Sequence, residues 1–370
     1  MKFNCDKNTI LKSISVAQDI ISTRNVLSIL SNVLLEAEDG GLRIKSSDLK
    51  VSFETTIPVE VIQPGTITVY CDKFNEILRS LPDGEIEFEL DDNNQFNIKT
   101  RFKKITFNLK SITAEKFPEL PAIDHESYFE FPQGDFIEMI SNTIFAISDD
   151  ETRYFMNGVY MEKMDNRLIM VASDGRRLSY VFRNIEGNFN DIKGIIIPAK
   201  ILTLLRKILP GEGNLFLAIT EKNIFIKFGS YKFSSNLIEG KFPNYHKVIP
   251  EKQEKTVKVL KNELESAVKR VSLMVEQKSR RVYLQITKDT MTVTSDMAEI
   301  GMAMEEIPCE YNGDDTTISI VLNCIYLLEP LREMKEDNVA IEFTSPDKTV
   351  SIKTVPDTHA LHIIMPMQKK

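Results

Sequence analysis

The stretch ASDGRRLS (172–179) contains a Ser-Asp pair that recurs twice in the chain, in SSDLKVS (46–52) and in TSDMAEIG (294–301). The aspartates of the three stretches are Asp48, Asp174 and Asp296, which are 126 and 122 residues apart. A nearly constant spacing of domain size in a chain of 370 residues indicates three copies of one module.

The sequence around each copy follows one order: a short strand, an amphipathic helix, a strand pair, a second helix and a closing hairpin. Apolar residues recur at helical spacing in the helices and alternate with period two in the strands. The closing hairpins read EIEFELDDNNQFNIKT, NLFLAITEKNIFIKF and NVAIEFTSPDKTVSIKT. The expected helices are Asp6–Ser22, Asp72–Leu81, Pro132–Ala146, Pro198–Pro210, Lys261–Glu276 and Asn323–Lys335.

These patterns predict an α+β fold of three repeated modules, each with two helices packed on roughly eight strands of antiparallel sheet. Linkers rich in proline and charge place the modules at 1–120, 127–250 and 255–370. Three modules in a row leave free sheet edges at both ends, and proteins normally cover or pair such edges. Two chains joined head to tail would close a six-module ring and remove both edges.

The composition indicates a globular protein, because 42% of its residues are hydrophobic and 27% are charged. No apolar run approaches the roughly 18 residues of a membrane span. The start, MKFNCDKNT, lacks the apolar segment of a signal peptide. The four cysteines form no Cys-x-x-Cys pair, which predicts a cytoplasmic protein with neither disulfides nor a zinc site.

The net charge of −8 argues against a nucleic-acid partner unless the positive charge is gathered on one surface. The six expected helices together carry about +1, which leaves about −9 for the remainder. The difference gives weak support to a basic surface formed by the helices.

No group of residues predicts catalysis or metal binding. The four histidines stand at no ligand spacing from cysteines or carboxylates, so packed or solvated histidines are expected. PGEGN (210–214) lacks the lysine and Ser/Thr of a phosphate loop and is interpreted as a turn. DDE (149–151) could hold two metal ions, but an exposed loop at a helix end is favoured. We therefore expect neither enzymatic activity nor a cofactor.

Six motifs, taken together and in order, resemble one known family. They are MKF at the start, RNVLSILSNVLLE (24–36), RYFMNG (153–158), ASDGRRL (172–178), GKFPNY (240–245) and MPM (365–367). Through them the chain resembles the bacterial DNA polymerase III beta subunit, the sliding-clamp family, over all three repeats. The resemblance implies a non-catalytic, head-to-tail dimeric ring around double-stranded DNA, without sequence preference. It also implies a pocket in which the replicative polymerase, the clamp loader and other partners dock a short linear motif.

The resemblance places this partner-peptide pocket around the middle Ser-Asp copy, where alone Gly-Arg-Arg occurs. From the residues alone, a solvated type I turn is favoured instead. Gly175 would permit close backbone approach, Leu178 would form an apolar wall, and Arg177 would hold a carbonyl or carboxylate of the peptide. The expected lining is Met156, Ser173, Gly175, Arg176, Arg177, Leu178, Pro243, Val248, Asn323, Tyr326, Met365, Pro366 and Met367.

The pocket departs from the family pattern at its rim. Arg176 stands where a histidine is common, Ser279 where an aromatic residue often adds a wall, and Lys247 where an arginine is frequent. IIMPM (363–367) could also be only the last core strand, although flexible methionines suit a surface that accepts several partners.

For DNA, the resemblance implies one set of contact residues. They are Arg24, Lys73, Tyr154, Phe155 and Lys200. Core packing is the alternative for Tyr154 and Phe155, because RYF adjoins an apolar strand. Asp72 and Asp150 stand where relatives have a basic and a neutral polar residue, so looser contact with phosphates is expected.

Dimer closure is expected between the first and third modules. Phe107 and Leu109 alternate onto one face of KITFNLK, and the resemblance sets Leu273 and Met274 opposite them. The predicted function is a processivity clamp that tethers the replicative polymerase to duplex DNA. The alternatives are a three-module protein-interaction scaffold without DNA encirclement and, less favoured, an enzyme in an unfamiliar fold.

Overall fold

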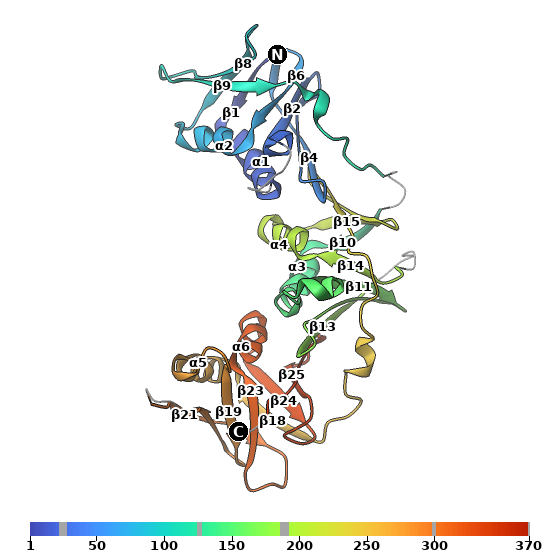
Figure 1. Cartoon of the computed structure of the whole chain (residues 1–370), viewed down its shortest axis with the longest axis vertical. Helices are drawn as coiled ribbons and strands as arrows, with labels where there is room; N and C mark the ends of the chain where they lie inside the picture. Colours follow the sequence, from blue (N-terminus) through green and yellow to red (C-terminus); the bar gives the residue numbers. More distant parts are fainter. Residues whose placement is uncertain (22–27, 124–127, 186–191, 298–300, 369–370) are drawn as a thin grey trace. The chain divides into compact units, whose positions relative to one another are not determined.

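A computed structural model describes residues 1–21, 28–123, 128–185, 192–297 and 301–368 (Figure 1). The chain folds into two compact units, Met1–Gly134 with Lys207–Leu237, and Asp135–Arg206 with Ile238–Lys370. Both combine α-helices with sheets in which all the described pairings are antiparallel, so the predicted α+β class is confirmed.

One sheet of 13 strands runs through the first unit, in the order β10-β15-β16-β17-β4-β3-β2-β6-β9-β8-β7-β1-β5. Its strands are β1 (Lys2–Asp6), β2 (Asn32–Glu38), β3 (Gly41–Ser47), β4 (Val51–Ile57), β5 (Glu60–Gln63), β6 (Gly65–Tyr70), β7 (Glu85–Leu90), β8 (Gln95–Thr100), β9 (Thr106–Ile112), β10 (Phe129–Pro132), β15 (Asn214–Ile219), β16 (Asn223–Phe228) and β17 (Tyr231–Asn236). Phe53 of β4 pairs with Phe233 of β17, so continuous sheet joins the first repeat to part of the second.

The second unit contains two sheets, β14-β11-β12-β13-β26-β25-β24-β18-β22 and β21-β20-β19-β23. Their strands are β11 (Gly158–Met164), β12 (Arg167–Ser173), β13 (Arg177–Asn184), β14 (Ile195–Pro198), β18 (Lys255–Leu260), β19 (Arg281–Ile286), β20 (Thr290–Ser295), β21 (Met304–Pro308), β22 (Glu310–Tyr311), β23 (Ile318–Asn323), β24 (Asn338–Phe343), β25 (Val350–Val355) and β26 (Ala360–Ile364). Leu178 of β13 pairs with Ile363 of β26. The second repeat is therefore split between the two units. One part of it continues the sheet of the first repeat, and the other part continues a sheet of the third repeat.

In the part of the chain that the structure describes, each repeat contributes two α-helices. They are α1 (Lys7–Ile20), α2 (Cys71–Ser80), α3 (Gln133–Ser141), α4 (Ala199–Ile208), α5 (Lys261–Val271) and α6 (Cys324–Glu333). Helix α1 packs against α2, β3 and β4, and α5 packs against α6, β20 and β21 (Figure 1). Within the described ranges, no helix is long and apolar enough to cross a membrane.

Helix α2 buries its apolar face in an aromatic cluster on the sheet, as its helical periodicity predicts. In the first unit, Phe3 and Phe88 stack with ring centroids 4.8 Å apart, and Phe74 and Phe96 complete this aromatic cluster. All four side chains are fully buried. Each contributes roughly 2–3 kcal/mol of apolar burial, so this cluster anchors α2 on the sheet.

All six helices end before their predicted last residue, and two of them end five residues early. Helix α3 stops at Ser141, and Ile144–Ala146 forms a separate 3-10 turn, η4. The hydroxyl of Thr143 donates to the Met139 carbonyl at 2.7 Å, and the Asn142 amide donates to the Glu138 carbonyl at 2.9 Å. Such side-chain bonds compete with the helical backbone. Helix α5 likewise stops at Val271, followed by η7 (Ser272–Met274).

The Ser-Asp turn has the same hydrogen-bond pattern in the first two repeats. The Asp174 carboxylate accepts from the backbone N–H of Arg176 and Arg177 at 2.8 and 3.0 Å. Asp48 accepts from the two corresponding N–H groups at 2.9 and 2.7 Å. The residue after each aspartate has positive φ, 87° at Gly175 and 71° at Leu49. A type I turn contains no such residue at its centre, so the type I alternative is wrong.

Leu49 adopts a left-handed conformation that costs a non-glycine residue about 1–2 kcal/mol. Its side chain is 53% exposed, so little packing would be lost on its removal. We expect Leu49→Gly to raise the free energy of unfolding by about 0.5–1 kcal/mol, measured by denaturant titration. Lys50→Gly, at a neighbouring position without positive φ, should lower it. Equal effects of the two changes would contradict the strain at Leu49.

Candidate functional site

The Arg177 side chain is the centre of the predicted peptide pocket. Its guanidinium donates to Asp174 Oδ2 at 3.1 Å and also binds Glu329 of α6 and the Phe145 carbonyl. The group lies over the Tyr326 ring, 4.5 Å from its centroid. Arg177 thus joins the turn to α6. These three bonds use three of the five N–H donors of its guanidinium, so two donors remain for a peptide carbonyl or carboxylate.

The C-terminal tail crosses from the turn to β23. The N–H of Met365 donates to the Arg176 carbonyl at 2.9 Å, and the N–H of Met367 donates to the Val321 carbonyl at 2.8 Å. Strand β26 ends at Ile364, so Met365–Met367 continue beyond the core strand as a hydrogen-bonded tail. The Met365 side chain is 46% exposed. IIMPM is therefore partly a core strand and partly an accessible apolar surface.

The segment after β17 brings Pro243 and Val248 to the same region. Phe242 and Tyr245 of this segment are buried in one cluster with Leu178 of β13 and Ile363 of β26. The Tyr245 hydroxyl donates to the Glu162 carboxylate at 2.5 Å, and the Tyr160 hydroxyl donates to it at 2.8 Å. Burial and this carboxylate together raise the pKa of both tyrosines.

The remaining predicted lining residues adjoin these groups. Arg153 lies between Met156 and the turn, because its Nη1 donates to the Asp174 carbonyl at 3.0 Å and lies 4.0 Å from the Met156 sulfur. The Asn323 side chain caps α6 by accepting from the Ile325 N–H at 2.9 Å. Ser173 accepts from the Gly175 N–H at 3.1 Å. All thirteen predicted residues thus belong to one set of contacting elements in the second unit.

The pocket region combines a buried floor with an exposed rim. Buried residues include Met156 and Leu178, whereas Arg176, Pro243, Val248 and Met365 are exposed. Exposed apolar side chains beside a charged residue are typical of a surface that binds a partner. Val248 and Met365 thus add exposed apolar surface beside Arg176, above the buried floor.

The predicted DNA residues differ in their exposure and partners. Tyr154 is 53% exposed and contacts Phe155 edge-on, so core packing is wrong for Tyr154, while Phe155 packs partly against the cluster around Leu178. Lys73 of α2 pairs with Glu76 at 2.6 Å, and Lys200 is exposed in the first turn of α4. Arg24 lies outside the described residues.

Both unusual aspartates are bound by neighbouring groups. Asp150 accepts from the Thr152 hydroxyl and N–H and from Arg153, and these bonds lower its pKa, with the Thr152 hydroxyl as the largest cause. It caps the 3-10 helix η5 (Glu151–Met156). Asp72 accepts from the Gln18 amide at 2.9 Å. DDE is therefore part of a capping turn, and within the described ranges no group of three His, Cys, Asp or Glu residues could hold a metal ion.

The predicted dimer residues lie on strand β9 and in the 3-10 turn η7 after α5. Phe107 and Leu109 pair with β8, and β9 meets β6 only at Ser111 and Ile112. In the third repeat, Leu273 of η7 is 79% exposed. Strand β21 pairs only with β20 within the described part of the chain. Each end repeat therefore offers a partly open sheet edge together with apolar side chains.

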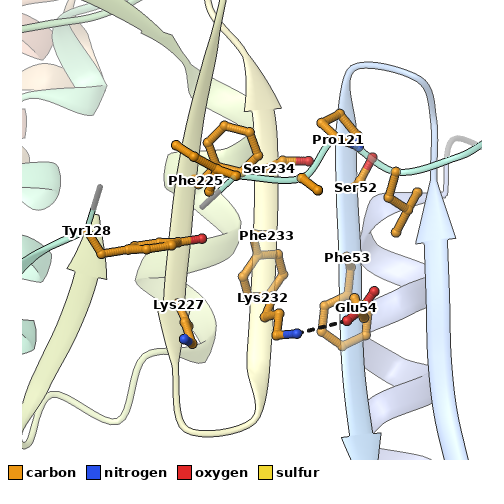
Figure 2. A pocket seen from close by; sticks show the side chains of 13 residues that line it. Ser52, Phe53, Glu54, Pro121, Tyr128, Phe225, Lys227, Lys232, Phe233 and Ser234 are labelled. Atoms are coloured by element: carbon orange, nitrogen blue, oxygen red, sulfur yellow. Dashed lines mark hydrogen bonds and ion pairs between the residues drawn. The ribbon is translucent and has the colours of Figure 1, made fainter. Parts of the chain in front are cut away.

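A separate hollow of about 250 Å³ lies in the first unit, where β16, β17 and β4 adjoin (Figure 2). Tyr128 and Phe225 line it, and Lys232 pairs with Glu54 at 3.0 Å across the β17–β4 junction. It shares no residue with the predicted peptide pocket. Its charged side chains are engaged within the chain, and the hollow carries no functional argument.

Family models match the chain in three consecutive parts. The N-terminal, central and C-terminal domains of the DNA polymerase III beta subunit match residues 1–121, 130–244 and 246–368. The chain belongs to the DNA polymerase III beta subunit family. It is 44% identical over 372 residues to the beta sliding clamp of Treponema pallidum (strain Nichols) and 29% identical over 371 residues to that of Escherichia coli K12, with every chain covered completely.

The fold gives the same family. The solved DNA polymerase sliding clamp of Bacillus subtilis superposes on the whole chain with a TM-score of 0.94 at 27% identity. The DNA polymerase III subunit beta of Pseudomonas aeruginosa reaches 0.93, also at 27% identity and complete coverage of both chains. The predicted three-repeat clamp fold is thereby confirmed.

The sequence analysis did not identify several residues that surround the predicted pocket. Glu329 stands three residues after Tyr326, so helical spacing could have placed both beside Arg177. Arg153 and Tyr245 lie within the quoted motifs RYFMNG and GKFPNY, but nothing in these motifs names their partners. The Phe145 contact uses a backbone carbonyl, for which side-chain patterns give no signal.

Proposed function

We propose that two copies of this chain form a head-to-tail ring that encircles duplex DNA and tethers the replicative polymerase. The family is a non-enzymatic family of sliding clamps, and the chain matches its members over their whole length. Partners, including the polymerase and the clamp loader, would dock short peptides in the pocket around Arg177. A protein of bacterial DNA replication is expected in the cytoplasm.

The observation that supports the proposal most is that the predicted pocket residues, which are far apart in the sequence, lie together in the structure. Parts of the sequence around 153–178, 240–248 and 321–367 are held together by Arg177, by the cluster around Leu178 and by the C-terminal tail. These parts come from the second and third repeats. A pocket built from two repeats explains why Gly-Arg-Arg occurs in only one copy of the turn.

The helices support a DNA-facing role by their charge. The six α-helices contain eleven Lys or Arg residues and nine Asp or Glu residues, which is a net charge of +2 in a chain of −8. Contact with phosphates needs positive charge but no base recognition, and a sliding ring requires that combination.

Glu76 neutralises one predicted phosphate contact, because it pairs with Lys73 at 2.6 Å. Glu76→Gln should free this lysine and strengthen binding to a nicked circular duplex. The slope of log affinity against log salt should become steeper by about one unit, measured by titration across salt concentrations. Glu221→Gln, in the turn between β15 and β16, is the control for a general change of charge. An unchanged slope for Glu76→Gln would remove Lys73 from the DNA surface.

The proposed assembly is tested by the mass of the protein in solution. Sedimentation should give a species of twice the 42.3 kDa chain mass. A protein that stays monomeric at micromolar concentration would contradict the ring and favour the interaction scaffold.

A further inference from the structure

Arg281 lies at the edge of the predicted pocket. It is the first residue of β19 and pairs in register with Asn323 of β23, a predicted pocket residue. Both side chains are on the face of this sheet opposite the core, because the alternate residues Val282 and Leu322 are buried in the core cluster. On the other edge of β23, the Val321 carbonyl accepts from the tail N–H of Met367.

The Arg281 guanidinium lacks the partners that the chain gives to comparable arginines. Its Nε and Nη1 atoms are buried, yet neither has a hydrogen-bond partner among the described residues. By contrast, Arg177, Arg183 and Arg270 each bind carboxylates. The Ser279 hydroxyl, two residues before Arg281, is also buried and unpartnered within that part of the chain.

Two carboxylates of the third repeat are already engaged elsewhere. Asp296 accepts from the Tyr283 hydroxyl, and Tyr283 is the next residue on the same face of β19. Glu329 binds Arg177. A buried donor without a partner carries a desolvation cost that an anionic ligand would remove. The residue as a whole is partly exposed, although Nε and Nη1 themselves are covered.

We infer that Arg281 and Ser279 form an anion-accepting extension of the peptide pocket, which favours partners with an acidic side chain beside their docking motif. The inference rests on the proposed function and adds the chemistry of the partner. A carboxylate suits this position because a guanidinium binds it through paired, charge-assisted hydrogen bonds, and the Ser279 hydroxyl can add a third. Ser279 and Arg281 replace the apolar wall that the family resemblance led us to expect with polar recognition.

The test uses the full-length chain and the C-terminal peptide of the cell's replicative polymerase. Each position that flanks the apolar residues of the peptide is replaced in turn by Glu and by Gln, and a version with an amidated C-terminus is included. Wild type should bind the best Glu peptide about tenfold more tightly than its Gln counterpart, as one partly buried charge-assisted contact gives. Arg281→Gln should abolish this preference, and Arg281→Glu should reverse it.

Two comparisons separate recognition from structural damage. Arg281→Gln should melt no lower than wild type, because the buried Nε and Nη1 atoms that it removes have no hydrogen-bond partner to lose. Arg280→Gln, at an exposed neighbour, should keep the preference for Glu. If only amidation weakens binding, the anion is the chain terminus and the acidic-side-chain inference is wrong. An equal affinity of wild type for Glu and Gln peptides would also overturn it. If wild type binds no version of the peptide, the proposed function itself fails.

Discussion

Replacing Leu273 by Ala and Met274 by Lys together should yield folded monomers that no longer stay on closed circular DNA. Leu273 is 79% exposed in the single chain, and burial of such a side chain contributes about 2 kcal/mol to an interface. A lysine placed in the same interface adds the cost of burying an unpaired charge. We therefore expect dimer dissociation to become at least about a hundredfold more favourable, measured by sedimentation over a range of concentrations.

The control for this double variant is Met164→Lys, which changes an exposed methionine of the second repeat. It should leave the dimer intact. Thermal melting of both variants should show that the monomer remains folded, because Leu273 packs little within its own chain. A double variant that still sediments as a dimer would show that the interface lies elsewhere.

Gly175→Leu, and separately the deletion of Met365–Lys370, should each weaken binding of a polymerase-tail peptide at least tenfold. An anchored side chain in a desolvated pocket contributes about 2 kcal/mol, or roughly thirtyfold in affinity. A Cβ at Gly175 would lie 2.9 Å from Arg153 Nη1, so the leucine must displace this arginine or enter the pocket. The deletion removes the tail that Arg176 and Val321 hold.

Gly175→Leu should nevertheless fold, because Leu49 occupies the corresponding turn position with φ of 71°. Gly229→Leu is the matched control, since Gly229 also has positive φ and its Cβ would meet no atom within 4 Å. It should share the backbone strain but bind the peptide normally. Both pocket variants should remain dimeric on DNA. Unchanged peptide binding in both would end the pocket assignment, whereas a large fall in melting temperature for the deletion would support a core-strand role.

The fold could be predicted from the sequence because the same order of helix and strand patterns recurs in three repeats. Helical spacing placed all six helices, but the end of α3 depended on Asn142 and Thr143 bonding to backbone carbonyls, which periodicity does not contain. The module boundaries were drawn at the linkers. The contacts instead follow the sheets, because β4 pairs with β17 and β13 pairs with β26 across the repeats.

The sequence could indicate which residues form the candidate site, but not which hydrogen bonds they make. The resemblance supplied the residues around Ser173–Leu178 and the tail, and the structure brings them together. It could not show that Asp174, Glu329 and Phe145 already occupy Arg177, because those partners come from three separate segments. Gly175 was expected to permit close approach of a peptide. Leu49 has positive φ at the same turn position, so this conformation belongs to the turn itself.

The most direct test of the ring is retention on DNA of different topology. The protein would be loaded onto nicked circular duplex with its clamp loader, separated from free protein by gel filtration, and the DNA then cut once. We predict that the protein stays with the circle through the column at moderate salt and is lost within minutes of linearisation, because it can slide off a free end. Equal retention on circular and linear DNA, or no retention on either, would contradict encirclement.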